Sequence, residues 1–110
     1  MAEGYIEAGR EFITPTYVND KIESCYIAYS HGVVSIYILG KMYQTYTHGE
    51  LLVTIPENYR PVSNDLVKVF NSGGTDTGNV SWASYTGSIT LNGSNTIGNS
   101  RLLITHTYVK

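Results

Sequence analysis

The sequence predicts an all-β domain, and three observations indicate it. Tyrosine is abundant, with ten among 110 residues, and valine, isoleucine and threonine are frequent; β-branched and aromatic side chains suit a pleated sheet. Apolar and polar residues alternate along most of the chain, without the apolar spacing of an amphipathic helix. Eleven glycines divide the alternating runs and supply turns. We therefore expect a small antiparallel β-barrel or a jelly-roll-like sandwich of about eight short strands.

A short strand leads the chain. We expect it at residues 5–8, before Gly9. Gly9 and the Thr14-Pro15 step interrupt the next segment, because glycine and proline both disfavour the interior of a strand. Residues 1 to about 20 are therefore predicted to form a leading strand and an irregular segment.

Two pairs of strands are predicted next. Each consists of two alternating runs separated by a His-Gly dipeptide, at residues 31–32 and 48–49, which suits a tight turn. The four strands are expected at residues 21–30, 33–39, 42–47 and 50–55. Pro56 ends the last of them because proline has no amide proton to donate to a strand ladder.

The second half of the chain continues with strands and polar connections. Residues 56–61 are predicted to form a rigid irregular link, because two prolines fix the backbone there. Residues 71–79 are predicted to form the longest polar loop. Asn92-Gly93 is a strong two-residue hairpin signal, and a turn-like stretch follows it to Ser100. The remaining strands are expected at residues 66–70, 80–85, 88–91 and 101–109.

The final strand has apolar residues on both faces, at Leu102-Leu103-Ile104. Two interpretations stay open: another subunit covers one face, or the strand lies inside a tight sandwich. The sequence has no linker, repeat or low-complexity tract. We therefore expect residues 1–110 to form a single β domain.

Composition argues against several classes of partner. Seven Lys and Arg residues are scattered along a chain of net charge −2, whereas a nucleic-acid binder concentrates basic residues in a patch. No apolar run approaches the length of a membrane span, and we expect no signal peptide at the amino terminus. We therefore expect neither nucleic-acid binding nor membrane insertion.

The sequence does not predict an enzyme. Its nine acidic residues show no pair placed for acid–base hydrolysis, and no nucleophile motif accompanies the serines. The histidines at 31, 48 and 106 are far apart, and the single cysteine, Cys25, is interpreted as a buried, inert thiol. We therefore expect no catalytic residues, no metal and no cofactor.

A saccharide-binding site is easier to support. Sugars present apolar faces that stack on aromatic rings and hydroxyls that bond to amides, carboxylates and arginine. Trp82 is the only tryptophan and follows the polar loop; it is either a stacking platform or, by its alternation with Val80, a core residue. The candidate ligand-binding residues are Asn71, Asp76, Asn79, Trp82, Tyr85 and Arg101.

The order of the segments resembles the head domains of bacteriophage receptor-binding proteins. The central match is a strand ending at Leu52-Val53-Thr54-Ile55, followed by Pro56-Glu57-Asn58-Tyr59-Arg60-Pro61. Asn58 stands where such heads often have glycine, and asparagine also tolerates a positive φ. The flanking segments that match in order are Tyr5-Ile6-Glu7-Ala8-Gly9, Ile22-Glu23-Ser24-Cys25-Tyr26, Gly78-Asn79-Val80, Gly87-Ser88-Ile89-Thr90-Leu91 and Tyr108-Val109.

This resemblance implies a homotrimeric head in the virion, at the phage tail tip or baseplate. Such a head binds bacterial cell-surface polysaccharide during adsorption and contacts other tail or baseplate proteins. The saccharide-contacting residues of these heads share no motif, so the resemblance assigns no site. Two alternatives are a structural, trimerising tip of a tail fibre that binds no receptor, and a cellular carbohydrate-binding module.

Overall fold

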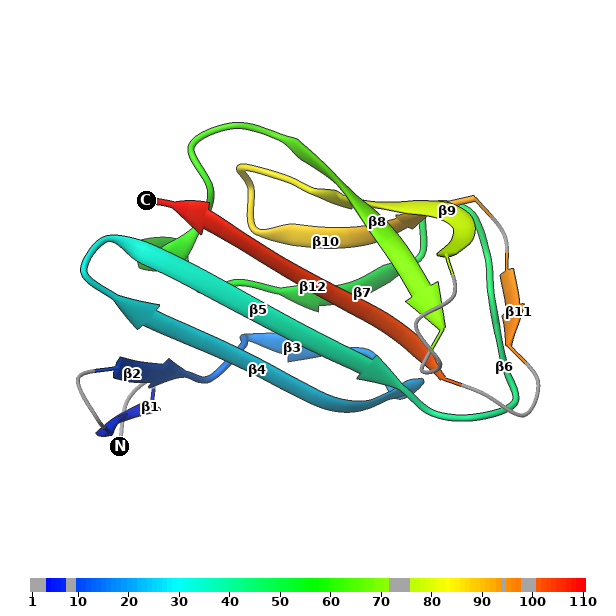
Figure 1. Ribbon diagram of the computed structural model, residues 1–110, viewed down its shortest axis with the longest axis horizontal. Helices are drawn as coiled ribbons and strands as arrows, with labels where there is room; N and C mark the ends of the chain where they lie inside the picture. The colour runs from blue at the N-terminus through cyan, green and yellow to red at the C-terminus, as the bar shows by residue number, and fades with distance from the viewer. Residues whose placement is uncertain (1–3, 8–9, 72–75, 94, 98–100) are drawn as a thin grey trace.

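The computed structural model describes residues 4–7, 10–71, 76–93, 95–97 and 101–110, and it confirms the all-β class (Figure 1). Within these ranges twelve strands and one 3-10 turn occur. In chain order they are β1 (Gly4–Glu7), β2 (Arg10–Ile13), β3 (Tyr17–Val18), β4 (Ile22–Ser30), β5 (Val33–Gly40), β6 (Gln44–Tyr46), β7 (Leu51–Thr54), η1 (Glu57–Tyr59), β8 (Asp65–Asn71), β9 (Asp76–Ala83), β10 (Ser88–Asn92), β11 (Asn95–Ile97) and β12 (Leu102–Val109).

Ten of these strands form one antiparallel sheet in the order β1-β2-β4-β5-β12-β8-β9-β10-β7-β3, and β6 and β11 pair separately. The sheet curls into a half-barrel, with β4, β5 and β12 in front and β7 and β10 behind them (Figure 1). Strand β3 shows the curling directly, because it pairs with β7 at one edge and yet lies between β2 and β4 in the chain. No described segment forms a helix suited to crossing a bilayer.

The concave side of the half-barrel contains the hydrophobic core. Alternate residues of each long strand point inward, as in β5, where Val34, Ile36 and Ile38 are all buried. Strand β12 pairs with β5 along seven consecutive positions, and its Leu102 and Ile104 join the same core. The residues between them point outward and form the convex surface.

The predicted β4–β5 hairpin is confirmed. His31 and Gly32 both adopt positive φ values, 50° and 81°, which match the primed turn that best connects two twisted strands. The register then pairs Ser30 with Val33 and continues to Ser24 opposite Leu39. A local alternating pattern on both sides of a short turn was sufficient to predict this element.

The hairpin predicted from residues 42–47 and 50–55 is wrong. Strand β6 is shorter and pairs with β11, whereas β7 pairs with β10 and β3. Tyr43 has a φ of 60° just before β6, and Tyr46 is fully buried. The chain therefore turns at 48–49 to reach new partners, as shown by the hydrogen bond from the Leu91 amide to the Glu50 carbonyl, 3.0 Å long.

Two expectations for the polar connections also need correction. The predicted loop at 71–79 is too long, because Asn71 still belongs to β8 and β9 begins at Asp76, in register with Phe70. Strand ladders are bonded through the backbone, so polar side chains do not prevent pairing. The Asn92-Gly93 step does not join a hairpin, since β11 follows it and pairs with β6.

Two short strands, β2 and β3, lie in the segment that was predicted to be irregular. They contain four and two residues, too few to show a pattern of alternation. The leading strand occurs at Gly4–Glu7, and Ala8, its predicted last residue, lies outside the described residues.

Candidate functional site

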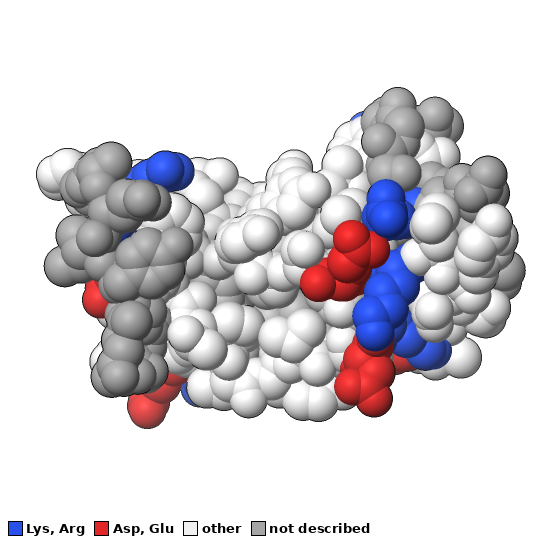
Figure 2. Space-filling model, turned by 90° about the horizontal axis from the view of Figure 1, so that it is seen from below, with Lys and Arg blue, Asp and Glu red and all other residues white. Residues whose placement is uncertain are grey.

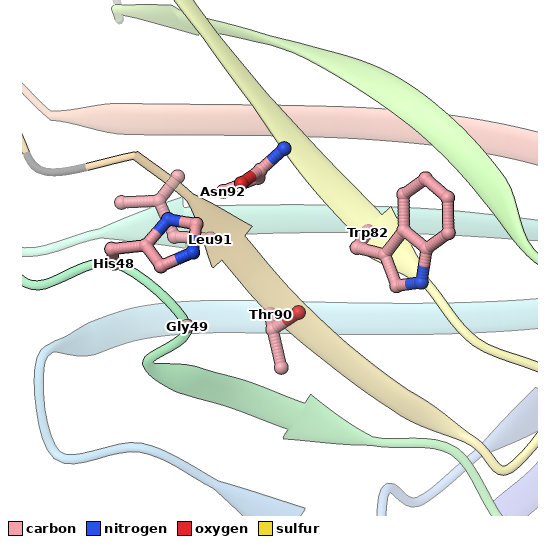
Figure 3. A pocket seen from close by; sticks show the side chains of 6 residues that line it. All are labelled: His48, Gly49, Trp82, Thr90, Leu91 and Asn92. Carbon is pink, nitrogen blue, oxygen red and sulfur yellow. The ribbon is translucent and has the colours of Figure 1, made fainter.

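An open groove of about 330 Å³ lies on the convex surface beside β10 (Figure 3). It is formed where β9 and β10 meet the turn before β7, so residues far apart in the sequence come together. Its lining residues are His48, Gly49, Trp82, Thr90, Leu91 and Asn92.

Trp82 lies on the outside of the sheet. Its neighbours in β9, Ser81 and Ala83, are buried, and alternation along a strand therefore directs the indole outward. The side chain is 37% exposed. The hydroxyl of Ser81 donates a hydrogen bond of 2.9 Å to the carbonyl of Thr90, which satisfies the polar group that this arrangement buries. The interpretation of Trp82 as a core residue is therefore wrong, and its position suits a stacking platform.

Thr90 and His48 form the rest of the groove. Thr90 is directly opposite Trp82 in the β9–β10 register, and His48 lies on the other side of Thr90 from the indole (Figure 3). The Nδ1 atom of His48 accepts a hydrogen bond of 2.8 Å from the backbone amide of Gly93. A neutral ring held in this way has its proton on Nε2, so it can donate one hydrogen bond.

Most of the described lining surface of the groove is apolar, and it contains no Lys, Arg, Asp or Glu. The hydroxyl of Thr90 and the amide of Asn92 can each donate and accept hydrogen bonds, and the indole offers an aromatic face and one N–H donor. This combination matches a ligand that has both an apolar face and uncharged hydroxyl groups.

The other sequence-predicted site residues lie elsewhere. Tyr85 is exposed in the β9–β10 turn, where its backbone amide bonds to Asn64 at 3.1 Å. Arg101 pairs with Glu23 at 3.1 Å at the start of β12. Asn71 is the last residue of β8, and Asp76 and Asn79 lie in β9 with side chains outside the described part.

The β8 register shows that these residues are not gathered at one place. Trp82 is opposite Leu66, whereas Asn71, five residues further along β8, is opposite Leu102, the neighbour of Arg101. At about 3.3 Å per residue, the two ends are roughly 17 Å apart. Of the six candidates, Trp82 lies in the groove. Asn71 and Arg101 lie at the opposite end of β8, away from the groove.

Sequence reasoning missed His48, Thr90 and Asn92. From the sequence, His48 is considered as part of a turn and, with the other histidines, as a catalytic or metal-binding residue, but not as a contact for a saccharide. Thr90 and Asn92 alternate with the apolar Ile89 and Leu91, and this pattern does indicate which residues of β10 face outward. Their proximity to His48 depends on the β7–β10 pairing, which has no local signal.

Charged residues lie together in a different place. Figure 2 shows acidic and basic side chains side by side toward one end of the molecule, next to a broad uncharged surface. Two ion pairs occur where β4 and β12 begin: Lys21 with Glu50 at 2.9 Å, and Arg101 with Glu23 at 3.1 Å. Because each charge has an opposite partner, we interpret this region as structural.

The described residues show no cluster of three or more metal-ligating side chains. Burial raises the pKa of Cys25 to about 11, so its thiol is protonated near neutral pH and is a poor nucleophile. His106 lies 3.2 Å from Asp65 on the concave side of the sheet, next to the buried Tyr108. These groups contribute to the packing of the half-barrel rather than to the groove.

Compared with known protein families and with curated protein sequences, the chain shows no match. What the domain binds must therefore be inferred from its own residues.

Proposed function

We propose that this domain binds a saccharide of the bacterial cell surface and does so as the receptor-binding head of a phage tail. The observation that supports binding most directly is the outward indole of Trp82 beside an uncharged groove that also presents the polar side chains of Thr90 and Asn92. Large aromatic side chains are usually buried, so an exposed one at the wall of a groove is a candidate contact site.

The chemistry of the groove suits a sugar. A pyranose has an apolar face of C–H groups that can stack on the indole of Trp82, and hydroxyls at its rim. Thr90, Asn92 and His48 supply donors and acceptors on the side where these hydroxyls would lie. A small apolar ligand would leave these groups unpaired, and an ionic ligand would find no opposite charge in the described lining.

The phage role is supported by the resemblance around residues 52–61. A head of this type functions as a homotrimer in the virion and is attached to other tail or baseplate proteins. Weak binding of each site to a repeating polymer then becomes tight binding of the whole trimer, because several linked sites raise the overall affinity by about 100- to 10,000-fold. A small groove with one aromatic residue is sufficient under these conditions.

Intrinsic fluorescence tests the proposal, because Trp82 is the only tryptophan. We would titrate the domain with a panel of purified bacterial surface polysaccharides and expect at least one to change the emission of Trp82. Trp82→Ala should abolish binding of that polysaccharide, measured by calorimetry. It should lower the free energy of unfolding by only about 1 kcal/mol, because the side chain packs on the outside of the sheet.

Tyr85→Ala is the matched control. Tyr85 is an exposed aromatic residue close in sequence but outside the lining of the groove. It should bind the polysaccharide as the unmodified domain does. If Tyr85→Ala loses binding and folded Trp82→Ala retains it, the site lies at the turn; if no polysaccharide in the panel binds, the proposal is wrong.

A second candidate function, a structural and trimerising tip, is favoured by a different surface. The outward residues of β4, β5 and β12 from Ser24 onward, which we call the tyrosine face, include no charged side chain; the exposed Glu23 lies at the edge of this face, where β4 begins. At its centre Tyr26 and Tyr37 lie in register, with ring centroids 5.9 Å apart. The tyrosine face consists of Ser24, Tyr26, Ala28, Ser30, Val33, Ser35, Tyr37, Leu39, Leu103, Thr105, Thr107 and Val109.

A further inference from the structure

The surface that includes Trp82 extends beyond the groove. Leu66 on β8 is directly opposite Trp82, Trp82 is opposite Thr90, and Thr90 is opposite Leu51 on β7. These four residues form a cross-strand row on the convex side, perpendicular to the strands. The groove covers only the Thr90 side of Trp82.

Leu66 is the unexplained part of this row. Its side chain is 59% exposed, even though it lies beside a large aromatic residue. Here the leucine and the indole both remain open, so an apolar surface continues from the groove across one further strand.

We propose that the ligand is a saccharide chain that crosses the strands along this row, with one sugar between His48 and Trp82 and the next sugar on Leu66. This inference rests on the proposed function and extends it from a single sugar to an internal segment of a polymer. Neighbouring strands are about 4.8 Å apart, so the Leu66 position lies one strand spacing from the Trp82 position along the row.

The geometry explains why a chain fits better than a chain end. A site for a terminal sugar needs a wall that closes one side. At Leu66 the described surface instead remains exposed, and a polymer can continue past it. The hydrogen-bonding side chains of His48, Thr90 and Asn92 lie on the groove side, whereas Leu66 on the other side offers only apolar contact. The first sugar would therefore be oriented by hydrogen bonds and the second held by contact area.

The test compares the lengths of one saccharide. The polysaccharide found by the fluorescence panel would be cleaved into fragments of one to six sugars, and their affinities measured through Trp82 emission. We expect affinity to rise by about tenfold between one sugar and two or three, the effect of covering part of a leucine side chain. Leu66→Ser should remove this rise and leave the affinity for one sugar unchanged.

Val62→Ser is the matched control, because Val62 is also an exposed aliphatic residue but lies before β8, outside the row. It should preserve the dependence on length. Equal affinities for fragments of all lengths would overturn the inference. A loss of affinity in Leu66→Ser that is the same for every fragment length would also overturn it, because Leu66 would then act only by supporting Trp82. A change of molar mass in Leu66→Ser would also overturn it, since a second copy would then cover the row. Failure of every polysaccharide to bind would instead contradict the proposed function itself.

Discussion

Glu50 joins three segments of the chain through a single carboxylate. It accepts hydrogen bonds from the backbone amide of Thr47 at 3.0 Å, from Asn19 at 3.0 Å and from Lys21 at 3.1 Å. Partial burial alone would raise the pKa of Glu50, but these bonds together outweigh it and lower the pKa below the ordinary value of 4.5. The ionised form is therefore the one that the folded state stabilises.

This shift predicts a stability that depends on pH. Because the pKa of Glu50 is lower in the folded state, its contribution is present above pH 4.5 and is lost as the pH falls through the folded value. Glu50→Gln should reduce the free energy of unfolding by about 1–2 kcal/mol at pH 7. The difference from the unmodified domain should shrink in urea denaturation at pH values below 4.5.

Glu23→Gln is the control for this prediction. Glu23 pairs with Arg101 at the surface, where single ion pairs contribute little, so its removal should change stability by less than about 1 kcal/mol. A loss in Glu50→Gln that stayed constant from pH 7 down to acid conditions would show that shape, rather than charge, accounts for the effect.

At the scale of elements, the link at residues 56–61 fixes the position of the β9–β10 turn. Arg60 Nε donates a hydrogen bond of 3.0 Å to the carbonyl of Ile55, so this arginine has a structural role in the link. The Ile55 amide donates to the carbonyl of Gly87 at 2.8 Å. A Cβ atom at Gly87 would collide with Arg60 and would lie 2.7 Å from the Ile55 oxygen. The link and the turn are therefore packed against each other.

Arg60→Ala should lower the melting temperature. Loss of one hydrogen bond and of the packed side chain costs about 1 kcal/mol, which corresponds to roughly 4–8 °C in a domain of this size. Circular dichroism at increasing temperature would measure it. Lys41→Ala, which removes an exposed basic side chain, should leave the melting temperature within about 2 °C. An unchanged melting temperature in Arg60→Ala would mean that the link is an ordinary surface turn.

The elements differ in how far the sequence predicts them. Strands β4, β5 and β12 each alternate over eight or nine residues, and the pattern placed all three within about one residue. Strands β2, β3 and β11 have two to four residues, and their pairing depends on partners that are distant in the chain. Local periodicity cannot predict a strand that exists only because a neighbour is present.

The site was less predictable than the long strands, because it too depends on pairing between segments that are distant in the chain. In the described part of β9, residues 80–83, Ser81 and Ala83 are buried and the large apolar residue Trp82 faces solvent. A prediction from the hydrophobic pattern of β9 would therefore turn Trp82 toward the core, whereas it faces solvent. His48 reaches the groove through the pairing of β7 with β10, so no motif in the sequence could have joined it to Trp82.

At the scale of the whole molecule, the convex side has two separate surfaces. The row through Trp82 lies on β7, β8, β9 and β10, and the tyrosine face lies on β4, β5 and β12. Charges are expected over much of a solvated surface, so twelve outward positions whose nearest charge within these strands is Glu23 at one edge are unusual for a face that meets only water. Tyrosine tolerates one dry and one wet end, which suits a surface between subunits. The proposed assembly and the proposed ligand binding therefore use separate surfaces.

The proposed homotrimer can be tested on this tyrosine face. Light scattering at micromolar concentration should give three times the chain mass of 12.2 kDa, and Tyr26→Lys combined with Tyr37→Lys should give the mass of one chain. Stable contacts bury about 800 Å² on each partner, and two lysines at the centre of an uncharged face would place like charges against each other. Tyr85→Lys, an exposed site away from this face, should remain a trimer.

The same variant separates assembly from recognition. Because Tyr26 and Tyr37 do not line the groove, the monomeric double variant should bind short saccharide fragments with unchanged affinity. Its binding to whole bacterial cells should fall by about 100- to 10,000-fold, since only linked sites engage a repeating polymer together. An unmodified domain that is monomeric and folded would contradict the trimer. If instead the trimer forms and binds neither cells nor polysaccharide, the structural tip is the function that the tyrosine face supports.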